Sequence, residues 1–388
     1  MAEPAGAVPG GGVDARLDAV LRDHMGFSNF SLTMARAWLS RTGGMGGDGA
    51  DELPVLRAWL LQLLNGKPRP PGVSNWQRLC PEVLPGLRSR PVWESADSPL
   101  LSWISELEAQ WEAVRDEAFA LRGAGVAAEF QPYRAPAWAG TAPSSGGSPL
   151  GALPVAPGES PGRASSAAVA ADATAGTAPA DAASPGAPVG TSGAHTEAHE
   201  GGSWSVCYLD LHGAVDTSAA LERCPATARL LAAVPRAYGH AMFSALAPGT
   251  DVSPHTGPTS KKLRVHLPLF VPARAAGGDP PCCLRVADRV EPQEEGRALV
   301  FDDSFEHEAW NRHETQPRLV LILDIWHPDL TEAEVKFLKF AQKSQTRRAK
   351  AVSVTMGGAV GGADDFLSVL SSARADAVAA ASVFPEAD

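Results

Sequence analysis

The sequence predicts a mostly β fold, an antiparallel double-stranded barrel with flanking helices, and three observations carry this prediction. Short apolar runs begin at Trp204, separated by Gly, Pro and Asp-rich turns at the spacing typical of a sandwich or barrel. No helical pattern alternates with these runs, which argues against a parallel α/β sheet. Residues 318–326 are apolar on both faces, as expected of a buried strand. The predicted strands are WSVCYLDL, AMFSALAP, LRVHLPLFVP, CCLRV, RALVFDD and RLVLILDIW.

Two helical patterns precede the barrel. In the first, Pro54 occupies the opening turn of a Leu-rich stretch that Gly66 ends. The second has Ser98 as its N-cap and apolar residues at three-to-four spacing as far as Leu121, so we expect one continuous helix packed on the scaffold. Residues 1–84 are predicted to be an N-terminal helical region, and the sequence does not reveal its role.

A low-complexity tract separates the second helix from the barrel. In residues 141–200, 47 of 60 positions are Ala, Gly, Ser, Pro or Thr, and no aromatic residue occurs between Trp138 and Trp204. Such a tract cannot bury enough apolar area to offset its ordering entropy. Residues 136–200 are therefore predicted to be a disordered linker or insertion. The tail, residues 345–388, is similar in composition, with a short helix expected within 364–384.

Composition excludes several classes of function. With 33 Lys+Arg against 44 Asp+Glu, the net charge of −11 disfavours the basic surface that nucleic acid requires. The five cysteines lack zinc-site spacing, and the adjacent Cys282 and Cys283 are expected as two thiols on opposite faces of a strand. The N-terminus has no signal-peptide pattern, and no stretch reaches the roughly 18 apolar residues of a membrane span. We expect a cytoplasmic protein; its oligomeric state is not readable.

Polar residues interrupt runs that should be core. Strand alternation in LRVHLPLF puts Leu263 and Leu267 on one face, and Arg264 with His266 on the other. A cation beside an imidazole within a barrel strand needs an anionic partner or a cavity. The alternative is that both residues lie on the exposed face of an edge strand.

Three further residues form a pattern when taken together. His255 precedes His307 by 52 residues, and Arg318 follows His307 by 11 and opens a buried strand, where we expect it at the rim of the barrel. Imidazole nitrogens suit Fe(II), and open coordination positions can take a 2-oxo acid and oxygen. A guanidinium can hold a carboxylate through two parallel hydrogen bonds. The pattern therefore suits an iron site beside a dicarboxylate co-substrate.

Residues 204–338 resemble the catalytic domain of the aspartyl/asparaginyl β-hydroxylases. The resemblance is carried by FSALAPGT, HTGPT, LRVHL, FDDSFEHEAWN and DIWHPDLT, in the family's order and spacing, and extends backwards through GLRSRPVW and the helix to Arg122. It implies a domain over 85–344, interrupted by the insertion 136–200, and a double-stranded β-helix (jelly-roll, cupin-like) fold. A long insertion is tolerable because loop-closure cost grows only logarithmically with length.

The resemblance implies an Fe(II)- and 2-oxoglutarate-dependent dioxygenase that uses O2. His255 and His307 would be the iron ligands, and Arg318 with Ser244 would hold the distal carboxylate of the co-substrate. The other family co-substrate or active-site positions are those of Arg264, His266 and Trp204.

The third ligand position of related dioxygenases is Gly257, which has no side chain to coordinate a metal. The resemblance therefore implies a two-His site, in which a water fills the empty position and Asp303 orients it. The alternative for Asp303 is a turn residue that caps the end of its strand.

The implied reaction hydroxylates a carbon of peptidyl Asp or Asn, or of a similar acidic substrate, and Lys262 with Arg264 would favour a carboxylate-bearing substrate. One alternative is an acyl chain or small acid as substrate. Another is a non-catalytic barrel that binds a partner, although such a barrel should have lost one of His255, His307 and Arg318.

Overall fold

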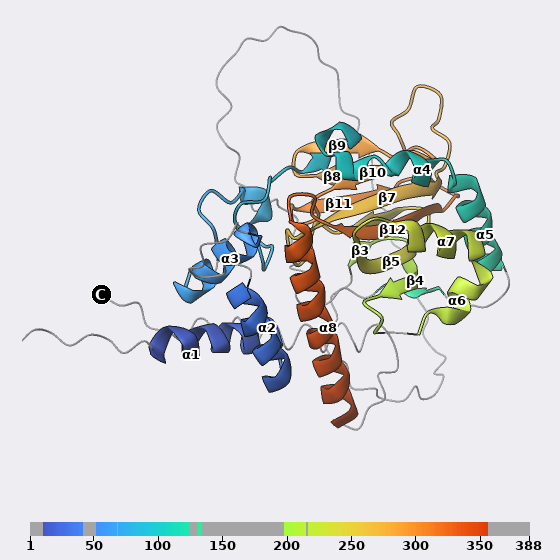
Figure 1. Ribbon diagram of the computed structural model, residues 1–388. Coiled ribbons are helices and arrows are strands. Elements are labelled where there is room, and N and C mark those ends of the chain that lie inside the picture. The colour runs from blue at the N-terminus through green and yellow to red at the C-terminus, as the bar shows by residue number, and fades with distance from the viewer. Residues whose placement is uncertain are drawn as a thin grey trace, which may run out of the picture. The chain divides into compact units, whose positions relative to one another are not determined.

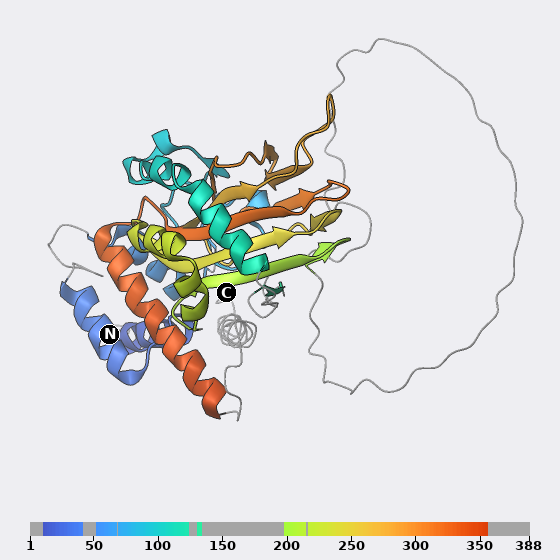
Figure 2. The same cartoon turned by 90° about the vertical axis from the view of Figure 1, so that its right-hand side faces the viewer.

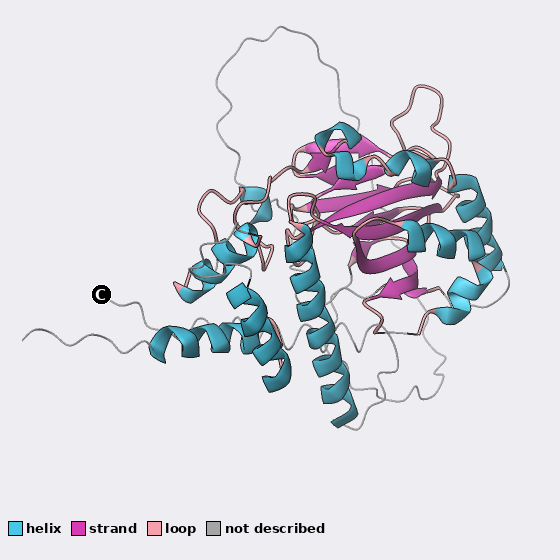
Figure 3. Cartoon of the chain, viewed as in Figure 1, coloured by secondary structure: helices cyan, strands magenta, loops and turns pink. Residues whose placement is uncertain are grey.

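The structure is a computed structural model that describes residues 11–41, 52–67, 69–123, 130–133, 198–214 and 216–355. Its centre is a pair of antiparallel sheets, with helices packed around them (Figures 1 and 3). The larger sheet has the strand order β1-β10-β7-β12-β5-β4-β2, and the smaller β3-β6-β11-β8-β9. The strands are β1 (Val92–Trp93), β2 (Gln131–Pro132), β3 (His199–Glu200), β4 (Trp204–Leu211), β5 (Ala237–Leu246), β6 (Thr250–Val252), β7 (Lys262–Phe270), β8 (Cys282–Val286), β9 (Arg289–Pro292), β10 (Leu299–Phe301), β11 (His307–Asn311) and β12 (Arg318–Trp326).

The last eight strands have the connectivity of a double-stranded β-helix. Strands β5, β7, β10 and β12 are neighbours in the larger sheet, while β6, β8, β9 and β11 are neighbours in the smaller one. The chain thus crosses between two antiparallel sheets and closes a jelly roll. This confirms the predicted mostly β fold. All six predicted strands exist, whereas the short strands β6, β9 and β11 were not predicted, because three to five partly polar residues give little periodic signal.

Strand β7 lies between β10 and β12, so the interpretation of Arg264 and His266 as edge-strand residues is wrong. Leu263 and Leu267 join the core on the outer side of the larger sheet, whereas Arg264 and His266 face the space between the sheets. Alternation of side chains along β7 therefore separates scaffold from site.

Four helices cover the outer face of the larger sheet, and Figure 2 shows α5 crossing it. The continuous helix predicted from Ser98 is interrupted. Ser98 does accept a hydrogen bond from Leu100 N, but the chain then divides into three helical segments, and the second break follows Glu108, whose carboxylate accepts a hydrogen bond from Ala298 N. The segments and covering helices are η4 (Pro99–Leu101), α4 (Ile104–Glu108), α5 (Trp111–Gly123), α6 (Ser218–Arg223) and α7 (Pro225–Ala233).

A second apolar core joins the N-terminal helices to the C-terminal helix α8 (Glu332–Thr355) and to Trp326 at the end of β12. The predicted Leu-rich helix is α3, and Leu56 and Leu60 are buried in this core. The remaining helices are α1 (Gly11–Ala19), the π-helical turn η1 (Val20–His24), α2 (Asn29–Arg41), α3 (Pro54–Leu64) and the short 3-10 turns η2 (Asn75–Gln77) and η3 (Ser95–Asp97). No helix in the described part of the chain has the length and apolar character needed to cross a bilayer.

The predicted insertion and tail fall mostly outside the described residues. Only residues 198–200 of the range 136–200 are described, and His199 and Glu200 form β3, which pairs with β6. Helix α8 continues past the predicted domain end at 344 as far as Thr355, and the helix expected within 364–384 lies outside the described residues.

The start of α8 is capped from two sides. Thr331 Oγ1 accepts from Glu334 N, and Glu334 Oε2 accepts from Thr331 N. The other oxygen of this fully buried carboxylate accepts from the backbone N–H groups of Val55 and Leu56 in the first turn of α3. One side chain therefore supplies hydrogen-bond acceptors to the N-termini of two helices.

His327 holds the end of β12 against the segment that leads into β1. Its Nδ1 accepts a hydrogen bond from Asp329 N at 3.1 Å, so the ring proton lies on Nε2, 3.3 Å from Arg88 O. Burial lowers the pKa of His327 to about 4. The unfolded chain therefore takes up the proton first as the pH falls, and the contribution of His327 to stability is complete above its ordinary pKa of about 6.5 and is lost toward pH 4.

We expect the stability advantage of the parent over His327→Gln to shrink by about 2 kcal/mol between pH 7.5 and pH 5. Urea unfolding of both proteins at each pH measures this difference. A difference that is independent of pH would show that His327 does not titrate in this way.

Candidate active site

The predicted site residues converge on one small cavity between the two sheets. Its volume is about 40 Å³, which corresponds to about three waters. Seven of the eight predicted site residues line it: Trp204, Ser244, His255, Arg264, His266, His307 and Arg318. The eighth, Asp303, is fully buried directly behind Gly257.

The two predicted iron ligands are side by side. His255 and His307 exchange both backbone hydrogen bonds, at 2.8 and 3.0 Å, and their ring centroids are 4.2 Å apart. Each Nδ1 lies within 2.9 Å of the carbonyl two residues earlier, that of Ser253 or of Phe305. A carbonyl only accepts, so each Nδ1 carries the proton and each Nε2 presents a lone pair. The pair is therefore arranged as two neutral Nε2 ligands would be.

Burial lowers the pKa of both imidazoles. For His255 desolvation is the main cause, opposed by the hydrogen bond to Ser253, and for His307 the neighbouring His255 adds to desolvation. Both rings are neutral at pH 7, which is the state that metal ligation requires.

Gly257 is the position where a third ligand would lie, and Asp303 fills the space beside it. A Cβ atom on residue 257 would lie 2.4 Å from Asp303 Oδ2, so a side chain there would require Asp303 to shift. Asp303 Oδ1 is buried without a hydrogen-bond partner in the described part of the chain. Within those residues no group of three His, Cys, Asp or Glu side chains could hold a metal ion. The residues fit a two-His centre with a carboxylate behind it.

Arg318 is buried, with 2% of its surface exposed, rather than at the rim of the barrel as predicted. It opens β12, but β12 has paired strands on both sides, which place its first residue in the interior. Its Nε and one terminal nitrogen have no hydrogen-bond partner among the residues that the structure describes, and burial lowers its pKa to about 10. An unpaired buried cation is costly unless an anion binds it.

Ser244 and Trp204 complete the anion end of the cavity. Trp204 Nε1 donates to Ser244 Oγ at 3.0 Å, which leaves the hydroxyl proton of Ser244 free to be donated to a ligand. His266 faces the same space, and its Nδ1 is buried without a partner in the described residues. Burial, reinforced by Arg318, holds the pKa of His266 well below its usual range.

Arg264 and Lys262 are not free cations. Arg264 donates to both oxygens of Asp324, at 2.8 and 3.0 Å. Lys262 Nζ lies 2.5 Å from Asp303 Oδ2 and 3.0 Å from Asp324 Oδ2. Burial would raise the pKa of Asp324, but the two cations outweigh it and keep the carboxyl ionised. Two cations and two carboxylates cancel, so the predicted attraction of Lys262 and Arg264 for an acidic substrate is not supported.

Sequence reasoning missed two residues of this site. Asp324 is the one charged residue within RLVLILDIW after Arg318, and a charge inside an apolar strand was the available signal, because buried charges are paired. Tyr133 also lines the cavity and stacks on Trp204, with ring centroids 3.8 Å apart. It follows the two-residue strand β2 and gives no pattern of its own.

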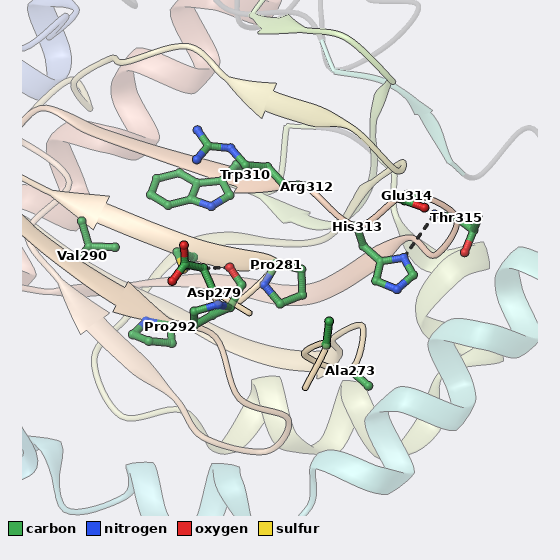
Figure 4. A pocket seen from close by; sticks show the side chains of 13 residues that line it. Ala273, Asp279, Pro281, Val290, Pro292, Trp310, Arg312, His313, Glu314 and Thr315 are labelled. Atoms are coloured by element: carbon green, nitrogen blue, oxygen red, sulfur yellow. Dashed lines mark hydrogen bonds between the residues drawn. The ribbon is translucent and has the colours of Figure 1, made fainter. Parts of the chain in front are cut away.

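A larger cavity, of about 790 Å³, lies on the other side of the smaller sheet (Figure 4). Trp310 and Val290 line it, with Pro281, Pro292 and Cys283. No predicted site residue reaches it, so size alone does not mark the site. Cys283 faces this cavity, whereas Cys282 Sγ donates a hydrogen bond to Asn311 Oδ1 inside the barrel, so the two thiols lie on opposite faces of the strand, as predicted. The five cysteines are free thiols.

The protein is thus a double-stranded β-helix protein with a candidate metal and anion site. Two imidazoles and a guanidinium without a partner in the described residues share one cavity between its sheets. Comparison with known proteins makes the assignment more specific. Residues 181–328 match the sequence model of the family described as "Aspartyl/Asparaginyl beta-hydroxylase". This segment of the chain is thus similar to the aspartyl/asparaginyl β-hydroxylase family.

Three relatives illustrate the match. The human aspartyl/asparaginyl beta-hydroxylase is 39% identical over 143 residues, 36% of this chain and 18% of that protein. The human aspartate beta-hydroxylase domain-containing protein 2 is 36% identical over 36% of this chain and 37% of its own length. The ornithine lipid ester-linked acyl 2-hydroxylase of Rhizobium tropici is 35% identical over 36% of this chain and 46% of its own length. The chain thus spans less than half the length of each.

Among solved structures, a prolyl-4-hydroxylase from Pseudomonas putida aligns with 32% of this chain and 72% of that chain. The TM-score is 0.24 and the sequence identity 15%, a likeness below the level at which a shared fold can be argued.

Proposed function

We propose that this chain is an Fe(II)- and 2-oxoglutarate-dependent dioxygenase that hydroxylates a carbon of peptidyl Asp or Asn, or of a similar acidic substrate. The observation that carries the proposal is Arg318, a buried guanidinium without a partner in the described residues, in the same cavity as the Nε2 lone pairs of His255 and His307. A dicarboxylic 2-oxo acid can bind a metal through its 2-oxo acid end and a guanidinium through its distal carboxylate. The cavity offers groups for both ends.

Each residue has a task that follows from its surroundings. Iron, when bound, would supply the oxygen activation that couples decarboxylation of the 2-oxo acid to C–H hydroxylation. His255 and His307 would hold it, with Asp303 orienting a water at the position left open by Gly257. Arg318 and Ser244 would bind the distal carboxylate.

A second candidate substrate is an acyl chain. The Rhizobium tropici relative is named for acyl hydroxylation, and the pairing of Lys262 and Arg264 with carboxylates removes the local preference for an acidic substrate. A non-catalytic barrel is disfavoured, because it would keep the unpaired charge of Arg318 without benefit. Cytoplasmic location and the absence of a nucleic-acid partner remain predictions from the sequence.

Succinate formation tests the proposal. The full chain is incubated with Fe(II), 2-oxoglutarate and oxygen, together with Asp- and Asn-containing peptides in one series and acyl lipids in another, and products are identified by mass spectrometry. We expect a gain of one oxygen atom on a peptide, matched by one succinate. Oxygenation of a lipid instead would favour the second candidate, and an absence of Mn(II) and 2-oxoglutarate binding would contradict both.

A further inference from the structure

The site depends on a segment that lies far outside the family match. We infer that residues 76–84, which we call the clasp, are a working part of the candidate metal centre: they bind both loops that carry the imidazoles and so fix the separation of His255 from His307. The inference rests on the proposed function, because it concerns the same site. The clasp precedes the matched residues 181–328 by almost a hundred positions.

One end of the clasp binds the loop that leads into His307. Gln77 Nε2 donates to Ser304 Oγ at 2.7 Å, and both side chains are at most 1% exposed. The carbonyl of Trp76 accepts from Glu306 N at 2.6 Å. Ser304 directly follows Asp303, and Glu306 directly precedes His307. The clasp therefore bonds to residues adjacent to both the carboxylate and the ligand.

The other end binds the loop that follows His255. Glu82 Oε1 accepts from Thr259 Oγ1 at 2.6 Å and from Lys261 Nζ at 2.7 Å. Ser260 is held twice, because its N–H donates to Glu82 O at 3.0 Å and its Oγ accepts from Leu84 N at 2.9 Å. All three loop residues are buried, at 7% exposure or less.

A two-His centre has special need of such support. His255 lies beyond the end of β6 at Val252, so no extended strand ladder holds it. The direct links between the loops are the backbone pair of His255 with His307 and the bond from Gly257 N to Asp303 O. A third protein ligand would restrict where the metal sits, and Gly257 provides none. Ligand geometry therefore depends on groups that bind the loops from outside as well as on these direct bonds.

Mn(II) affinity, read by electron paramagnetic resonance at a temperature well below every unfolding midpoint, tests the clasp. We expect Gln77→Met and Glu82→Gln each to weaken Mn(II) binding by about 10- to 100-fold, the range for residues that support metal ligands. Glu334→Gln is the matched control. It replaces one buried carboxylate oxygen by an NH2 group that cannot accept, so either the bonds from Val55 N and Leu56 N or the bond from Thr331 N are lost, without touching either loop. It should lower the thermal midpoint while Mn(II) affinity stays at the parent value.

A double-mutant cycle isolates one clasp bond. Ser304→Ala should weaken Mn(II) binding through loss of the bond from Gln77 Nε2. Gln77→Met loses this bond and also the one that its Oε1 accepts from Ser89 Oγ, so the combined variant should be no weaker than Gln77→Met. If Glu82→Gln fails to fold, the Gln77 and Ser304 variants still test whether the clasp supports the metal centre. Clasp variants that bind Mn(II) as tightly as the parent, or a Glu334→Gln variant that binds as weakly as they do, would overturn the clasp. A parent that does not bind Mn(II) would overturn the proposed function itself.

Discussion

Replacing His255 and His307 together with alanine is expected to abolish Mn(II) binding and all 2-oxoglutarate turnover. The two Nε2 lone pairs are the protein ligands that the cavity offers in the described residues, and Gly257 cannot supply another. Loss of both leaves solvent and weak oxygen donors as ligands, so affinity should fall beyond the measurable range. Calorimetric titration with Mn(II), together with a succinate assay, measures both consequences.

His313 provides the control for this prediction. It is a histidine on the loop between β11 and β12, but it lines the larger outer cavity, where its Nδ1 accepts hydrogen bonds from the backbone of Thr315 and Gln316. His313→Ala should leave Mn(II) affinity unchanged. Retained Mn(II) binding in the His255/His307 double variant would place the metal elsewhere.

Substitution of Arg318 should weaken the binding of 2-oxoglutarate but stabilise the ligand-free protein against unfolding. Arg318→Ala is expected to weaken 2-oxoglutarate binding by about 2–4 kcal/mol, or about 30- to 700-fold, because the carboxylate loses its buried partner. Arg318→Met loses the same partner but fills the same space. It should stabilise the ligand-free protein by about 1–4 kcal/mol, since it removes a buried charge that has no counter-ion within the described ranges.

Two measurements separate these effects: 2-oxoglutarate titration of the Mn(II)-loaded protein, and urea unfolding without ligand. Arg312→Met is the control, because Arg312 is exposed, pairs with Asp251 and stacks on Trp310, outside the barrel. It should alter neither quantity appreciably. If Arg318→Met destabilised the ligand-free protein, Arg318 would have a structural partner, and its assignment as an empty carboxylate site would be wrong.

The parts of the site that could be predicted are those carried by local pattern. Alternation along β7 puts Arg264 and His266 on the inner face, and His255, His307 and Arg318 follow one another at a spacing that suits an iron site beside a dicarboxylate. What could not be predicted depends on register. Asp324 lies opposite Arg264 because β12 and β7 pair with that offset, and pairing between distant strands is invisible in either strand alone.

Burial and contacts between distant segments could not be predicted from the sequence for the same reason. The depth of Arg318 follows from the central position of β12, which the order of strands along the chain does not reveal. The clasp is still harder to predict, because Gln77 and Ser304 are 227 residues apart and the segment that contains Gln77 has no periodicity. Contacts of this kind leave no trace in a window of neighbouring residues.

The contact between Gly257 and Asp303 constrains how this protein can change. A carboxylate at position 257 would give the centre a third ligand, but its first side-chain atom would fall on the carboxylate of Asp303. A substitution at 257 therefore requires the buried carboxylate of Asp303 to shift from its place beside Lys262. Shrinking Asp303 first would leave Lys262 with Asp324 alone, in a pocket already shared with Arg264. To change the two-His centre into one with a carboxylate ligand at position 257, the chain would first have to shift or replace Asp303, and its replacement would remove the charge balance around Lys262 before the new ligand is gained.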